Sequence, residues 1–288
     1  MAQIQWYPGH MAKAEREIEG KMKLIDIVIE LVDARAPYSS KNTTFDRLIK
    51  NKPRLLVMTK KDLADDAITA KWSQYFEKQG YGVMVANMKN FNEYKKIIAK
   101  CRLILKDKMD KEAARGLKPR AIRAMVIGVP NVGKSTFINS LAKRKAAVTG
   151  NRPGVTKAQQ IIRVEKDFEL FDTPGVLAPR YNDEKIARNV ALIGSIRQDI
   201  LPRDDLFIYA VKYLNKQYPD ALKKRYDVSF DEEDDWVIPV FDQIAKVRAI
   251  KKVRGETDYE RVMDVFFKDL QDGAFGKISW EMPPCVND

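Results

Sequence analysis

The chain has 288 residues, 45% of them hydrophobic, and a net charge of +12. This composition supports a packed core in one large or two ordinary domains, and it excludes a disordered chain. No apolar run reaches the ~18 residues of a membrane-spanning helix, and the first residues lack the apolar core of a secretory signal, so we expect no membrane partner. Two cysteines and one histidine exclude a disulfide scaffold and an ordinary zinc site. They also suit the reducing cytoplasm, where we expect the protein to act.

The first part of the chain alternates between apolar runs and helix-compatible stretches. Such runs, rich in β-branched residues and ended by small or polar ones, predict strands. They lie at residues 25–33, 55–59, 83–86, 124–128, 161–164 and 170–172. Strands that alternate with helices predict an α/β fold with a mostly parallel sheet and helices on both faces.

After Arg180 the periodicity becomes helical. Amphipathic patterns with no competing strand signal occupy residues 184–200, 204–217, 235–252 and 258–272. Gly273 stands where a helix C-cap is expected. We therefore expect two domains, an α/β domain over residues 1–178 and an all-helical domain over residues 179–288.

The strongest motif is GVPNVGKST, at residues 128–136, which follows a predicted strand and precedes a predicted helix. This is the context in which the GxxxxGK[ST] pattern forms a phosphate-binding loop, or P-loop. Backbone N–H groups of such a loop wrap the phosphates, its lysine contacts the terminal phosphates, and its hydroxyl residue holds Mg²⁺. The residues expected to contact the nucleotide here are Asn131, Val132, Gly133, Lys134, Ser135 and Thr136.

Two tetrapeptides at strand ends complete the pattern. DTPG, at residues 172–175, places Asp172 to hold Mg²⁺ and Gly175 to contact the γ-phosphate. TKKD, at residues 59–62, places Thr59, Lys60 and Asp62 beside the nucleotide's base. A carboxylate there accepts hydrogen bonds from two N–H groups that guanine has and adenine lacks. The alternative for Asp62 is a helix N-cap before Leu63.

The order of these motifs is unusual, because TKKD precedes the P-loop. In this it resembles the circularly permuted GTPases. WYPGHMAKA at 6–14, DARAP at 33–37, KPRAIR at 118–123 and RPGVT at 152–156 resemble the bacterial ribosome biogenesis GTPase A family. The resemblance implies a circularly permuted P-loop GTPase domain followed by a helical domain associated with RNA and the large ribosomal subunit.

The resemblance also assigns roles residue by residue. Thr156 matches the switch threonine that completes the Mg²⁺ shell, or it is an ordinary loop threonine. Asn131 matches an asparagine that binds K⁺ in related GTPases, or it serves the turn after Pro130. Val176 stands where Ras-like enzymes place a water-positioning glutamine, so the family's candidate for that work is His10. The alternative for His10 is packing or RNA contact.

Two positions depart from the family pattern. Thr59 replaces the usual asparagine, whose amide helps to brace the P-loop, so we expect a loss of about 1 kcal/mol in nucleotide binding. Asn87 and Met88 replace the usual Ser-Ala of the guanine loop, where backbone N–H groups contact the base. We expect the catalytic residues to be His10, Lys134, Thr156 and Gly175, and the metal ligands to be Ser135, Thr156 and Asp172 for Mg²⁺ and Asn131 for K⁺.

The charge is concentrated in one segment. Residues 100–163 contain sixteen basic and three acidic residues. Such a block predicts a polyanionic partner, and a solvated basic face is the alternative.

These observations indicate a monomeric GTP-hydrolysing assembly factor that docks on rRNA and proteins of the large ribosomal subunit with GTP bound and leaves after hydrolysis. We expect slow hydrolysis by the protein alone and stimulation by the subunit. The alternatives are a P-loop ATPase or kinase with an accidental TKKD, and an RNA-binding module with a passive nucleotide site.

Overall fold

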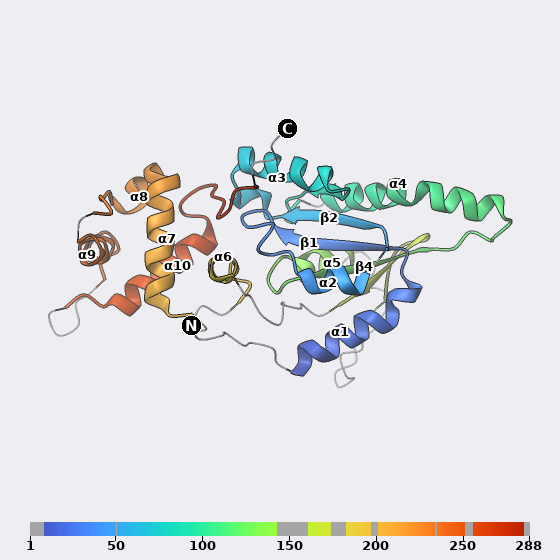
Figure 1. Cartoon of the computed structure of the whole chain (residues 1–288), viewed down its shortest axis with the longest axis horizontal. Helices are drawn as coiled ribbons and strands as arrows, with labels where there is room; N and C mark the ends of the chain where they lie inside the picture. The colour runs from blue at the N-terminus through green and yellow to red at the C-terminus, as the bar shows by residue number, and fades with distance from the viewer. Residues whose placement is uncertain are drawn as a thin grey trace.

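A computed structural model describes residues 9–49, 51–90, 92–142, 161–173, 183–196, 201–233, 235–250 and 256–284. Figure 1 shows an elongated molecule in which a sheet with its covering helices occupies one part and a group of helices occupies one end. We call these parts the sheet domain and the helical domain.

The sheet domain is built on six strands in the order β3-β2-β1-β4-β6-β5. All neighbours pair in parallel except β5 and β6, which are antiparallel. The strands are β1 (Ile27–Asp33), β2 (Arg54–Thr59), β3 (Gly82–Val85), β4 (Ile122–Gly128), β5 (Ile161–Glu165) and β6 (Phe168–Asp172). Because β1 is buried on both faces, its apolar residues do not alternate with exposed ones, and the buried Glu30 within it pairs with Arg54.

Helices cover both faces of the sheet. They are α1 (Gly9–Lys21), α2 (Thr43–Ile49), α3 (Asp66–Lys78), α4 (Asn92–Ala114) and α5 (Lys134–Ala142). Val28 and Val32 of β1 pack with α1, α2 and α3, whereas Ile29 and Leu31 pack with α4 and α5. Alternate side chains of one strand therefore serve opposite layers, as the period of two requires.

The helical domain contains α6 (Glu184–Leu192), α7 (Arg203–Gln217), α8 (Pro219–Tyr226), α9 (Val237–Val247) and α10 (Tyr259–Asp272). At its centre Phe207 stacks on Phe241, with ring centroids 4.2 Å apart, and meets Phe266 edge to face at 4.8 Å. Gly273 ends α10 in the left-handed conformation at φ +77°. Helix α8 was not predicted from the sequence, because its eight residues carry only two buried side chains, Leu222 and Tyr226.

After α10 the chain returns to the sheet domain. The amide of Trp280 donates to the Arg35 carbonyl at 2.7 Å, and the amide of Ile278 donates to the Leu63 carbonyl at 3.0 Å. The Glu281 carboxylate accepts from the amides of Tyr38 and Ser39. The two domains are thus joined by the chain end as well as by the segment before α6.

The structure confirms the predicted fold class, a mostly parallel sheet with helices on both faces and a helical C-terminal region. The predicted boundary at residues 178–179 lies outside the described residues, so it stays a prediction. No helix in the described part of the chain combines the length and apolar character needed to cross a membrane.

Candidate nucleotide-binding site

The predicted motifs meet at one edge of the sheet. Strands β3, β2, β1, β4 and β6 run in the same direction, so their carboxyl ends lie side by side. Residues 87–88 follow β3, TKKD follows β2, the P-loop follows β4, and Asp172 ends β6. This edge is where open parallel sheets bind their ligands.

The P-loop starts at a glycine that no larger residue could replace. A Cβ on Gly128 would lie 2.7 Å from the Leu31 carbonyl oxygen and 2.9 Å from Cγ1 of Val132. Gly133 adopts φ +108° and Asn131 adopts φ +58°, and both values favour glycine or asparagine. The loop then leads into α5, whose N-terminus is a favourable place for phosphate.

Thr59 braces this loop across the sheet. Its hydroxyl lies 2.6 Å from the Val132 carbonyl oxygen, to which it donates, and 3.0 Å from the carbonyl oxygen of Val32. A Cβ on Gly133 would lie 3.8 Å from Met88 Cγ and 4.0 Å from Thr59 Cβ. The loops after β2, β3 and β4 therefore converge at Gly133, and the hydroxyl of Thr59 keeps the bracing contact for which an amide was expected.

Lys134 and Asp172 carry the charges at the phosphate end. Lys134 is only 9% exposed, and this burial lowers the pKa of its ammonium, although the nearby Asp172 carboxylate opposes the shift. Burial raises the pKa of Asp172, although Lys134 opposes it. Among the described residues neither forms an ion pair within 4.0 Å. A buried ammonium without a counter-ion is costly, and a bound polyphosphate would supply that counter-ion.

Two hydroxyls stand beside these charges. Ser135 and Thr136 are exposed at the start of α5. The hydroxyl of Thr173 donates to the Val126 carbonyl at 2.5 Å, which fixes the end of β6 next to β4.

The end of this edge that is expected to bind the guanine base is formed by Asp62 and the loop after β3. Asp62 lies within a short 3₁₀ helix, Lys61–Leu63, and Asp65 rather than Asp62 caps α3 by accepting from the Ile68 amide. The helix-cap alternative for Asp62 is therefore wrong. Lys89 donates to the Asp62 carboxylate at 2.8 Å through a side chain that is 76% exposed.

Asn87 and Met88 precede Lys89 and shape the same loop. The Asn87 side-chain oxygen accepts from the Lys89 amide, and the hydroxyl of Tyr94 donates to the Met88 carbonyl. The contact with Tyr94 ties the loop to α4, and the contact between Asn87 and Lys89 fixes the turn of its backbone.

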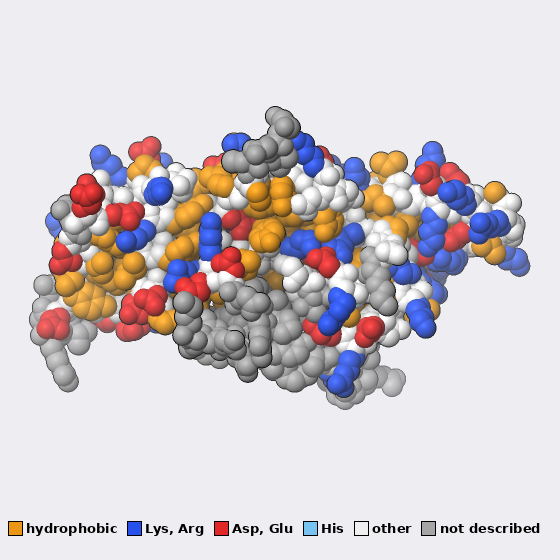
Figure 2. All heavy atoms as spheres, in the orientation of Figure 1, with side chains coloured by type: hydrophobic (Ala, Val, Ile, Leu, Met, Phe, Trp, Pro, Cys, Tyr) orange, Lys and Arg blue, Asp and Glu red, His pale blue; other side chains and the backbone are white. Residues whose placement is uncertain are grey.

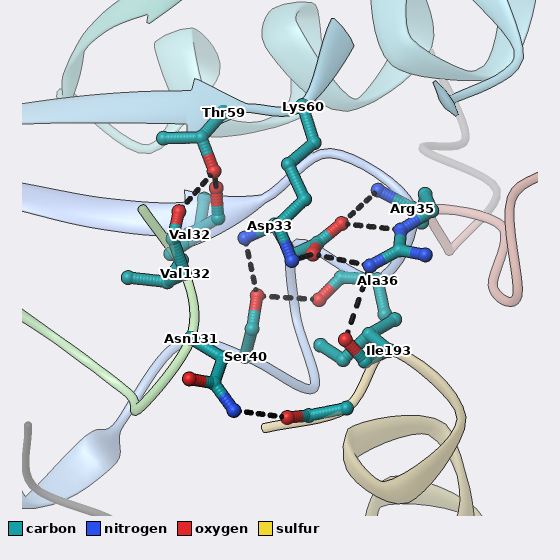
Figure 3. A network of polar contacts seen from close by, with 11 residues as sticks. Val32, Asp33, Arg35, Ala36, Ser40, Thr59, Lys60, Asn131, Val132 and Ile193 are labelled. Carbon is teal, nitrogen blue, oxygen red and sulfur yellow. Dashed lines mark hydrogen bonds and ion pairs between the residues drawn. The ribbon is translucent and has the colours of Figure 1, made fainter. Parts of the chain in front are cut away.

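A buried ionic network that the sequence did not reveal lies between the two ends (Figure 3). The Arg35 guanidinium donates to both carboxylate oxygens of Asp33, at 3.0 and 2.9 Å, and the Lys60 ammonium lies 2.8 Å from Asp33 as well. The amide of Asp33 donates to the Ser40 hydroxyl. Burial opposes ionisation of Asp33, but the two cations hold the pKa of its carboxyl below its usual range.

This network reaches the helical domain. Arg35 donates to the Ile193 carbonyl at 3.1 Å, and the amide nitrogen of Asn131 donates to the Gly194 carbonyl at 2.7 Å. Both acceptors lie just after α6, at the start of the helical domain. A side chain of the P-loop and a side chain linked to TKKD therefore hold two adjacent residues at the end of α6 (Figure 3).

The structure thus brings Thr59, Lys60, Asp62, Asn87, Met88, Lys134 and Asp172 and the other P-loop residues to one edge. The backbone of His10 lies in the first turn of α1, but its side chain lies outside the described residues. Thr156 and Gly175 lie outside them too. The ligand roles of all these residues stay predictions. The motif DARAP was the one signal for the Asp33–Arg35 pair, and nothing in its spacing pointed to Ile193.

Known proteins match the chain along its whole length. The model of the family described as 50S ribosome-binding GTPase matches residues 123–251. A Bacillus cereus protein named ribosome biogenesis GTPase A is 46% identical over 280 residues, which cover 97% of this chain and 94% of that protein.

Solved structures agree with this match. The GNP-bound crystal structure of YlqF from T. maritima has a TM-score of 0.66 and 26% identity, and the match covers 94% of this chain and 98% of that one. The GDP-bound structure of the TM YlqF protein has a TM-score of 0.67 and 25% identity, with 93% and 99% covered.

Proposed function

Because the chain belongs to the ribosome biogenesis GTPase A family and is a GTP hydrolase, we propose that it docks on the large ribosomal subunit with GTP bound and leaves after hydrolysis. The observation that carries this proposal is the meeting of the TKKD loop, the loop after β3 and the P-loop at Gly133. The loop expected to bind the guanine base thus contacts the loop expected to bind the phosphates, and this arrangement suits a single guanine nucleotide. An ATPase or kinase with an accidental TKKD would not require that contact.

Mg²⁺ fits the phosphate end of the site. Ser135 offers an exposed hydroxyl and Asp172 a half-buried carboxylate, and oxygen ligands are what Mg²⁺ prefers. In the proposal these two residues and Thr156 hold the ion, which neutralises charge on the phosphates. Lys134 binds the terminal phosphates, and the amide of Gly175 responds to the γ-phosphate.

K⁺ fits Asn131. The amide nitrogen of this side chain is held by the Gly194 carbonyl, and within the described residues its oxygen accepts no hydrogen bond. That oxygen is free to bind a monovalent cation beside the phosphates while the nitrogen keeps its contact with the helical domain.

His10 is proposed to position or activate the attacking water, since Val176 has no polar side chain for this work. We expect His10→Ala to lower subunit-stimulated GTP turnover by about 10²- to 10⁴-fold. GDP affinity should stay within twofold of the unchanged protein, because His10 lies outside the P-loop, TKKD and the loop after β3. Single-turnover hydrolysis with large subunits measures the first quantity and calorimetry the second. Unchanged turnover would assign His10 to packing or RNA contact.

The partners in this proposal are rRNA and proteins of the large subunit, met in the cytoplasm by a monomer. Co-sedimentation with purified large subunits, run with GDP and with a non-hydrolysable GTP analogue, tests the cycle. A two-state switch of the ordinary kind should favour the GTP-bound complex by about 1–3 kcal/mol, or roughly 5- to 150-fold. Equal pelleting with both nucleotides would leave a passive RNA-binding module.

A further inference from the structure

Charge is distributed unequally between the two ends of the molecule. Residues 1–178 carry a net charge of +15, whereas residues 179–288, with 18 basic and 21 acidic residues, carry −3. The helical domain is therefore slightly acidic overall, and most of the net positive charge that could attract an RNA backbone lies in the sheet domain.

Within the sheet domain, helix α4 extends beyond the core. Its buried residues end at Leu105, and none of residues 106–120 is buried. Figure 1 shows this helix running past the strands, at the end of the molecule opposite the helical domain. Figure 2 shows Lys and Arg side chains gathered on that end. Beyond Leu105 the helix keeps only partial contact with the fold, through Met109 and Lys108, so most of its surface there is open to a partner.

Several basic side chains of this region are already neutralised within the fold. Arg120 and Lys108 both contact the Asp26 carboxylate, at 2.6 and 2.7 Å, and Arg123 lies 3.5 Å from Glu169. Asp26 is 3% exposed, and although burial opposes ionisation, these partners hold its pKa below its usual range. Arg120 and Arg123, which belong to the basic segment of residues 100–163, are therefore paired within the fold.

Besides Lys106, which lies on another face of α4, four other basic residues within residues 100–120 have no acidic partner among the described residues. These are Lys100, Lys111, Arg115 and Lys118, which we call the α4 ridge. Lys100 and Lys111 are three helical turns apart and so share a face, and Arg115 follows one turn later. Lys111, Arg115 and Lys118 are exposed and Lys100 is half-buried. The ridge offers free positive charges along one face of α4 and in the segment that directly follows the helix.

We propose that the α4 ridge binds the sugar-phosphate backbone of RNA and so orients the protein on its partner. This rests on the ribosomal function proposed above and names the surface that meets the RNA. Contacts of this kind position a protein without reading sequence, because they reach phosphates and not base edges.

The test compares two quadruple variants with the same loss of charge. The ridge variant is Lys100→Gln, Lys111→Gln, Arg115→Gln and Lys118→Gln. The matched control is Lys216→Gln, Lys223→Gln, Lys224→Gln and Lys246→Gln, on exposed positions of the helical domain. Binding to an RNA duplex of arbitrary sequence and to purified large subunits is followed across a salt series, and thermal melting and GDP affinity verify the fold.

In the ridge variant, the slope of log affinity against log salt should flatten by about 3, since each phosphate contact contributes roughly 0.7–0.9. The control variant should keep the slope of the unchanged protein to within about one unit. Equal flattening in both variants would reduce the effect to net charge and overturn the proposal.

A protein partner for α4 gives a different result. Leu103 and Leu117 are 63% and 57% exposed beside the ridge. If Leu103→Ala with Leu117→Ala weakened subunit binding while the ridge variant did not, the surface would bind protein and the RNA proposal would be wrong. Neither result decides the proposed GTP cycle. That cycle is tested separately, by the nucleotide dependence of co-sedimentation in the unchanged protein.

Discussion

Asp62→Asn is expected to weaken GDP and GTP binding by about 10²- to 10⁴-fold, because two hydrogen bonds to a charged carboxylate contribute roughly 1.5–3 kcal/mol each. The same change should admit xanthine nucleotides, since the amide of asparagine donates where xanthine carries a carbonyl. Calorimetry with GDP, xanthosine diphosphate and ADP measures all three affinities. In the unchanged protein, ADP should bind about 10⁴-fold more weakly than GDP.

Two controls separate base recognition from local structure. Lys89→Ala removes the ion pair of Asp62 without removing its carboxylate, so GDP affinity should be kept or slightly raised. Asp65→Asn alters a neighbouring carboxylate that only caps α3, and asparagine caps as well. If Lys89→Ala reproduced the loss seen in Asp62→Asn, the role of Asp62 would be structural. Equal affinities for ADP and GDP would point to an ATPase.

The fold and the phosphate cradle could be predicted because their determinants are local. Gly128 and Gly133 stand at strand and helix ends that the apolar pattern already marks, and parallel strands bring such ends to one edge. The contact between the Thr59 hydroxyl and the Val132 carbonyl could not be predicted, because the sequence does not show which backbone group lies within reach of that hydroxyl, and the expected loss in nucleotide binding stays a prediction.

Contacts between distant residues could not be predicted in the same way. Arg35 meets Ile193, 158 positions later, and Arg120 meets Asp26, 94 positions earlier. The count of charges in residues 100–163 could not show that Arg120 pairs with Asp26 and Arg123 with Glu169, because both acids lie outside that segment of the sequence. Helix α4 was missed because its buried positions, such as Ile97 and Cys101, stand among many lysines.

The buried pair of Asp33 and Arg35 gives the largest expected change in stability. Arg35→Met removes two hydrogen bonds from a fully buried carboxylate and leaves the Ile193 carbonyl without its donor. Breaking a buried pair from one side costs about 3–5 kcal/mol in the free energy of unfolding. Arg203→Met is the matched control, because Arg203 pairs with the exposed acids Glu260 and Asp264, and about 0–1 kcal/mol is expected there.

The pH dependence identifies the cause of that loss. In the unchanged protein the pKa of Asp33 is lowered, so its contribution is present above the unfolded pKa and is lost only as pH falls through the lower folded value. Without Arg35 only Lys60 opposes the effect of burial, so the pKa of Asp33 should be higher in the variant than in the unchanged protein, and lowering the pH protonates Asp33 more readily in the variant. Urea unfolding at pH 7.5 and pH 5 should therefore show a smaller difference between the two proteins at the lower pH.

Asp33→Asn combined with Arg35→Met should recover part of the loss at pH 7.5, because no buried charge is then left without its guanidinium partner. A loss that is the same at both pH values and in the double variant would mean that Arg35 acts through packing alone.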